Sequence, residues 1–104
     1  MIDVSASVSG ALVTVTGDLD LSVSDSAPAA LRQVSHLEHD RLVLDVCGMG
    51  FMDSSGATWL ITLADEVGRR GGTTVLRGAS ARDLFVLKVA GALDLFEIDT
   101  AHRC

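Results

Sequence analysis

Residues 41–60 read RLVLDVCGMGFMDSSGATWL, and the pattern of this stretch changes in its middle. The segment 41–49 is a short, nearly continuous apolar run, which is typical of a β-strand covered on both faces. From about residue 55 to residue 69, apolar residues recur at helical spacing, and a Gly-Gly pair ends the pattern. The stretch therefore predicts a buried strand that passes directly into an amphipathic helix.

Strand-like and helix-like segments alternate along the rest of the chain. The first two strands flank a Ser9-Gly10 turn, which predicts an N-terminal β-hairpin. Strands separated by helices pair in parallel through right-handed crossovers, so the hairpin adds an antiparallel edge to a mixed sheet. We expect strands over 1–8, 11–20, 41–49, 73–79 and 93–99, the last short or irregular, and helices over about 27–37, 55–69 and 81–90.

This order predicts a single α/β domain over residues 1–104, with a mixed sheet of four to five strands and about three main helices packed on it. Gly17 interrupts the second strand near its end, which indicates a bulge or a close backbone approach. Ser80 and Asp83 form a capping-box pattern at the start of the last main helix. The apolar side of that helix is expected to hold Leu84, Phe85, Leu87 and Val89.

The charge balance limits the classes of partner. The chain has 8 Lys and Arg against 14 Asp and Glu, a net charge of −6. Nucleic-acid binding rewards clustered Lys and Arg, so it is not expected. No stretch offers the ~18 apolar residues of a membrane-spanning helix, and the N-terminus lacks the basic region of a signal peptide. The composition predicts a soluble, cytoplasmic protein.

Neither the cysteines nor the histidines show the spacing of a metal site. Cys47 and Cys104 are isolated in a chain without export signals, so a disulfide is not expected. Cys47 is interpreted as a small buried apolar residue. His36 and His39 stand three apart, but nothing supplies further ligands, so a solvated polar turn is favoured. We expect no metal and no other cofactor.

Asp53, Ser54, Ser55 and Gly56 form the polar junction between the strand and the helix. Asp53 or Ser54 is expected to cap the helix by accepting a hydrogen bond from a first-turn N–H, but capping needs only one polar side chain. A phosphorylated hydroxyl would gain about −1.5 to −2 charges at a helix N-terminus, where N–H donors and the helix dipole favour an anion. The junction therefore predicts a switch that changes the surface without unfolding the domain.

Catalysis by the junction serines is disfavoured. The G-x-S-x-G pattern of a nucleophile elbow is absent, and the three histidines are poorly placed to supply a base. No lysine completes a phosphate-binding loop, and Asp53 would repel a nucleotide phosphate. We expect no enzyme activity, and a small serine hydrolase stays as the alternative from another class.

Asp18 and Asp20 stand two apart at the end of the second strand, so both side chains point to the same face. They form either a solvated strand end or an acidic patch for a basic partner. The residues alone leave both interpretations open.

Three stretches together resemble the STAS domain family, specifically the bacterial anti-sigma factor antagonists. VLDVCGMGFMDSSGATWL, residues 43–60, resembles the family signature, with D-S-S-G in its strand–helix context as the specific part. TGDLD, residues 16–20, resembles the element that ends the second strand of these domains, and residues 81–98 resemble their C-terminal helix and strand. The resemblance covers essentially the whole chain.

The resemblance implies a switch between two complexes. The unphosphorylated chain would bind an anti-sigma factor that is also a GHKL-type serine kinase, and would thereby free the sigma factor. Phosphorylation of Ser54 would break that complex, and a PP2C-type phosphatase would restore it. Gly56 would let the partner's backbone approach. The partner-binding residues that the resemblance implies are Asp18, Asp20, Asp53, Ser55 and Gly56.

Other roles known for STAS domains stay open. The chain could instead be a subunit of a lipid-transport ATPase complex or a stress-signalling scaffold, and some STAS domains bind nucleotides. Two features depart from the family pattern: ATWL follows Gly56, and VAGALDLF carries one extra residue. Trp59 is either part of the core or part of an unusual partner surface.

Overall fold

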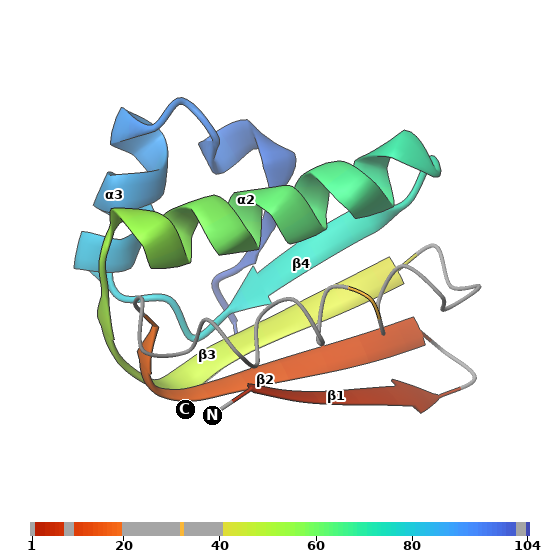
Figure 1. The fold of residues 1–104 in the computed structure, drawn as a ribbon, viewed down its shortest axis with the longest axis horizontal. Helices are drawn as coiled ribbons and strands as arrows, with labels where there is room; N and C mark the ends of the chain where they lie inside the picture. Colours follow the sequence, from red (N-terminus) through yellow and green to blue (C-terminus); the bar gives the residue numbers. More distant parts are fainter. Residues whose placement is uncertain (1, 8–9, 20–31, 33–40, 102–103) are drawn as a thin grey trace.

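The protein folds as one five-stranded sheet with helices packed on it (Figure 1). The computed structural model describes residues 2–7, 10–19, 32, 41–101 and 104. β1 pairs antiparallel with β2 and the remaining pairs are parallel, which confirms the predicted mixed sheet and its N-terminal hairpin. In spatial order the strands are β1 (Ile2–Ser7), β2 (Gly10–Leu19), β3 (Arg41–Met52), β4 (Thr73–Arg77) and β5 (Glu97–Asp99).

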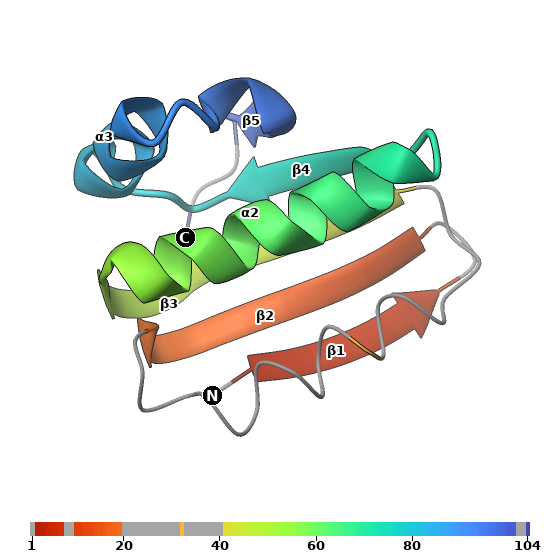
Figure 2. The same cartoon turned by 45° about the horizontal axis from the view of Figure 1, so that its top comes forward.

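The described part of the chain holds two α-helices, α2 (Ser54–Arg69) and α3 (Ala81–Val89), followed by a 3-10 turn over Leu93–Leu95. Both helices begin within one residue of the predicted position. About three helices were predicted, and the segment expected to form the first, about 27–37, lies outside the described residues apart from Arg32. α2 runs alongside β3 and β4 in both views of the ribbon (Figure 1, Figure 2).

The hydrophobic core lies between the sheet and α2. Leu44 of β3 and Leu63 of α2 are 0% exposed. Alternate residues of a strand point to opposite faces, so the β3 residues between the core positions face away from α2. These residues, Val43, Asp45 and Cys47, are only partly buried, so the prediction that β3 is covered on both faces is confirmed for one face alone.

The pairing of β2 with β3 shifts register twice, once between Thr14 and Thr16 and once between Gly17 and Leu19. Gly17 has φ of +74°, a conformation that glycine adopts without steric cost. The irregularity predicted at Gly17 is therefore confirmed. Its consequence is that Leu19, the last residue of β2, pairs with Met52, two residues before the start of α2.

Cys47 and Cys104 form a disulfide, so the expectation of two unpaired cysteines was wrong. The reason lies in the sheet, because Arg77 of β4 pairs with Asp45 of β3 on one side and with Asp99 of β5 on the other. Cys47 lies two residues beyond Asp45 within β3, and Cys104 lies beyond Asp99 of β5, so the parallel pairing places both cysteines toward the same end of the sheet. The Cα atoms of the two cysteines are 5.4 Å apart although 57 positions separate them in sequence.

Candidate functional site

The polar junction begins α2, and Asp53 is its N-cap. The Asp53 backbone is extended, with φ of −93° and ψ of −174°, and its Oδ1 accepts a hydrogen bond from the Gly56 N–H at 2.9 Å. The predicted capping role of Asp53 is therefore confirmed. Asp53 Oδ1 also accepts a hydrogen bond from the Ser55 hydroxyl at 2.6 Å.

These hydrogen bonds stabilise the ionised carboxylate. The bond from the Ser55 hydroxyl and then the bond from the Gly56 N–H lower the pKa of Asp53 below its ordinary value of 3.8. A negative charge therefore lies at the positive end of the α2 dipole at neutral pH. The site is acidic before any modification.

The two serines of the junction differ in accessibility. Ser55 is partly buried, and its hydroxyl is bound to Asp53. Ser54 is exposed, and its Oγ makes no hydrogen bond with the part of the chain that the structure describes. Only the Ser54 carbonyl is engaged, as the acceptor for the Thr58 hydroxyl at 2.9 Å. Of the two serines, Ser54 is therefore the more exposed.

Gly56 holds the junction against the end of β2. It is buried, and a Cβ added there would collide with the Leu19 carbonyl oxygen and lie 2.9 Å from Leu19 Cγ. The same Leu19 carbonyl accepts a hydrogen bond from the Asp53 N–H at 3.3 Å. The absence of a side chain at Gly56 thus has an intramolecular reason, and the approach of a partner's backbone there stays a prediction.

Asp18 lies beside the junction and contacts the end of β3. Its Oδ1 accepts a hydrogen bond from the Phe51 N–H at 2.8 Å, and a Cβ on Gly50 would lie 2.7 Å from the same oxygen. Asp18 is exposed, so its carboxylate both ties β2 to β3 and faces solvent. Asp20, the other acid of the predicted pair, lies outside the described residues.

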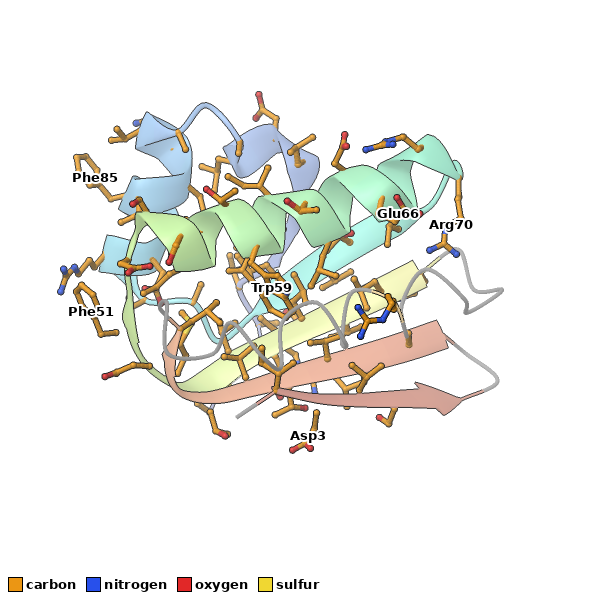
Figure 3. The ribbon with its side chains drawn as sticks, viewed as in Figure 1. Asp3, Phe51, Trp59, Glu66, Arg70 and Phe85 are labelled. Atoms are coloured by element: carbon orange, nitrogen blue, oxygen red, sulfur yellow. A yellow bond between two sulfur atoms is a disulfide. The ribbon has the colours of Figure 1, made fainter. Side chains whose placement is uncertain are left out.

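An exposed apolar surface near the start of α2 was not predicted. Phe51 is 41% exposed, Phe85 64% and Val89 71%, and the Arg82 guanidinium lies 4.8 Å from the centre of the Phe51 ring. Phe51 and Phe85 appear at the end of the molecule where α2 begins (Figure 3). Helical spacing placed Phe85 and Val89 in the core. In the structure Leu87 is buried and Leu84 is partly buried, as predicted, whereas Phe85 and Val89 are exposed.

Trp59 belongs to the margin of the core. It is partly buried and packs against the core cluster, which agrees with the first of the two roles considered for it. Within the ranges that the structure describes, no three His, Cys, Asp or Glu side chains are grouped as a metal ion would require. His36, His39 and His102 lie outside those ranges. None of the described helices is long and apolar enough to cross a membrane.

The depressed pKa of Asp53 predicts a pH-dependent helix cap. A carboxylate whose pKa is lower in the folded state stabilises the fold above its unfolded pKa, and this contribution is lost as the pH falls through the folded value. Thermal midpoints of wild type and Asp53→Asn are compared between about pH 3 and pH 7. Asn still caps but cannot ionise. We expect the difference in thermal midpoint between wild type and Asp53→Asn to shrink below about pH 4. A difference that stays constant with pH would contradict the role of the ionised Asp53 carboxylate as the helix cap.

Three comparisons with known proteins bear on this site. A family model described as the STAS domain matches residues 2–103. A comparison with curated proteins gives no match.

Several solved structures share the fold. The anti-sigma factor antagonist SpoIIAA in its unphosphorylated form matches with a TM-score of 0.76 and 17% sequence identity, and the match covers 97% of this chain and 90% of that chain. The phosphorylated form of Bacillus SpoIIAA also matches. RsbS of Moorella thermoacetica, with a serine replaced by glutamate, matches with a TM-score of 0.78 and 19% sequence identity, and the match covers 94% of this chain and 85% of that chain. An anti-sigma factor antagonist from Mycobacterium paratuberculosis matches with a TM-score of 0.76 and 22% sequence identity, and the match covers 97% of this chain and 86% of that chain.

Proposed function

The chain belongs to the STAS domain family, and we propose that it is an anti-sigma factor antagonist whose protein binding is switched off by phosphorylation of Ser54. The observation that carries the proposal is the difference between the two junction serines. Ser54 offers an exposed hydroxyl in the first turn of α2, whereas the Ser55 hydroxyl is bound to Asp53. Two structural neighbours are the unphosphorylated and phosphorylated forms of SpoIIAA, which supports a phosphorylation switch on this fold.

The switch is electrostatic. A phosphate on Ser54 adds about −1.5 to −2 charges to a junction where Asp53 is already ionised. The helix N-terminus favours that charge within the protein, so the fold tolerates the phosphate. A partner that binds the neutral serine closely must then accommodate a second negative group, and like charges brought together at an interface cost several kcal/mol.

The proposed cycle uses this chain as a substrate and not as an enzyme. In its unphosphorylated form the chain binds an anti-sigma factor that is a GHKL-type serine kinase, and the sigma factor is released. The kinase transfers the γ-phosphoryl group of ATP to Ser54 Oγ, and the complex dissociates. A PP2C-type phosphatase hydrolyses the phosphoserine and regenerates the binding form. All of these partners act in the cytoplasm.

The surface around the junction supports protein binding. Asp18 lies beside Phe51, and Arg82 of α3 stacks on the Phe51 ring, so β2, β3 and α3 contribute side chains at one end of the molecule. Aromatic and arginine side chains are enriched at protein interfaces. We propose that this end of the domain, including Ser54 and Phe51, is the face that docks on the kinase.

A phosphorylation assay tests the proposal. The purified chain is incubated with ATP and its co-encoded serine kinase, and intact mass is measured before and after. We expect one added phosphate on wild type and on Ser55→Ala, and none on Ser54→Ala. Fragmentation then locates the group. Phosphate on Ser55, or on neither serine, would contradict the proposal.

The competing roles have separate readouts. Capture of a transporter ATPase in place of a kinase would favour the transport subunit. Labelling of Ser54 or Ser55 by a fluorophosphonate probe would favour a serine hydrolase.

A further inference from the structure

The disulfide joins parts of the fold that are distant in sequence. Cys47 lies in β3, and Cys104 lies in the segment after β5. β5 is three residues long and, among the described strands, pairs with β4 alone. The disulfide is therefore a major connection between the segment after β5 and the centre of the sheet.

Gly78, in the turn between β4 and α3, provides the space in which the disulfide lies. Its φ is +81°, and a Cβ there would collide with Cys47 Sγ and lie 2.9 Å from Cys104 Sγ. Ser80, two residues further on, is the N-cap of α3 and accepts a hydrogen bond from the Asp83 N–H at 3.1 Å. The two sulfur atoms thus pack directly on the turn that positions α3.

Access to the two sulfur atoms is unequal. Cys104 is exposed, whereas Cys47 is partly buried. Thiol–disulfide exchange requires attack of a thiolate on an accessible sulfur, and exposed disulfides are the labile and regulatory ones. In a reducing compartment, a disulfide of this kind is a transient, redox-sensing bond.

We propose that Cys47 and Cys104 form a reversible redox modification site that controls how firmly α3 and β5 are held against the sheet. Opening uses a dithiol: one thiolate attacks Cys104 Sγ, Cys47 leaves as a thiolate, and the second thiol resolves the mixed disulfide. Two electrons and two protons pass from the dithiol to the two cysteines. Closing uses a peroxide, which oxidises one thiol to a sulfenic acid and releases water. The other thiol then displaces a second water to form the disulfide.

Opening this bond acts on α3 more than on the start of α2. The segment after β5 loses its covalent link to β3, and the turn at Gly78 loses the disulfide on which it packs, so α3 is less firmly placed. Phe85 and Val89 are exposed on that helix. The α2 junction keeps the hydrogen bond from the Asp53 N–H to the Leu19 carbonyl and the packing of Gly56, neither of which involves a cysteine.

Comparison of oxidised and dithiothreitol-reduced protein tests this site without any partner or phosphate, so its result is separate from that of the proposed switch. A disulfide that closes a loop of this length stabilises a small domain and raises its thermal midpoint by about 10 °C or more. We expect reduction to lower the midpoint by that amount. Hydrogen exchange should accelerate more in α3 and β5 than at the start of α2.

The controls are Cys104→Ser and Cys47→Ser, of which the first changes an exposed side chain and should fold. Both variants should resemble reduced wild type and should not respond to dithiothreitol. Thiol alkylation after peroxide treatment should label neither cysteine of wild type. Alkylation of both cysteines after peroxide, an equal effect of dithiothreitol on Cys104→Ser, or unchanged exchange in α3 on reduction would each overturn the proposal.

Discussion

Gly56→Ala should destabilise the domain by about 3 kcal/mol, which lowers the thermal midpoint by roughly 10–20 °C. The new Cβ would collide with the Leu19 carbonyl oxygen, a backbone atom that cannot move aside by changing a rotamer. The same carbonyl accepts the Asp53 N–H, so relief of the collision must shift the start of α2 away from β2. Thermal and urea unfolding followed by circular dichroism measure the loss.

Gly68→Ala is the matched control, because Gly68 lies in the same helix and a Cβ there meets nothing within 4 Å. Alanine in a helix interior is favoured over glycine by about 1 kcal/mol, so this variant should be as stable as wild type or more so. If both substitutions change stability equally, the contact between Gly56 and Leu19 does not matter. The glycine of D-S-S-G would then have to be explained by partner binding alone.

Ser54→Asp should weaken binding to the anti-sigma kinase by about 100-fold or more, with little change in the thermal midpoint. The aspartate places a second carboxylate next to the ionised Asp53, in the surface that is proposed to contact the partner. Within the free protein the charge lies in the first turn of α2, where the helix dipole favours an anion. Titration calorimetry gives the affinity, and thermal unfolding confirms that the fold is retained.

Ser54→Asn separates charge from size, because asparagine has the shape of aspartate without its charge. It should bind far more tightly than Ser54→Asp, and Ser54→Ala should bind at least as well as wild type and resist inactivation by ATP. Equal loss in the asparagine and aspartate variants would mean that bulk, and not charge, breaks the complex. Wild-type affinity in all three variants would remove Ser54 from the interface.

The features that the sequence predicted correctly depend on neighbours within a few positions. Asp53 caps α2 because its carboxylate reaches an N–H three residues ahead, and Ser80 and Asp83 complete their capping box over the same spacing. The hairpin and the succession of strand and helix follow from periodicity over short windows in the same way. The assignment of one family to the whole chain rests on these local patterns.

The features that were missed depend on segments that are distant in sequence. The disulfide joins Cys47 to Cys104, and no spacing rule reveals it, because only the parallel pairing through Arg77 brings the two positions together. Phe85 and Val89 fit a buried helical stripe by pattern, but both are exposed, because only the tertiary arrangement decides which side of α3 is covered. The ion pair between Asp45 and Arg77, with 3.1 Å between its charged atoms, also forms only when β3 pairs with β4.

The sequence by itself determined where the first four strands and the two described helices begin, how α2 is capped and which residues form the polar junction, because hydrogen bonds and side-chain periodicity act over one or two helical turns. Only the tertiary structure decided which of the two serines is accessible and why Gly56 has no side chain. The first depends on how the start of α2 packs in the folded domain, which leaves Ser54 exposed and Ser55 partly buried. The second depends on the Leu19 carbonyl, which belongs to a strand that pairs with β3 across the sheet and reaches Gly56 only in the folded domain.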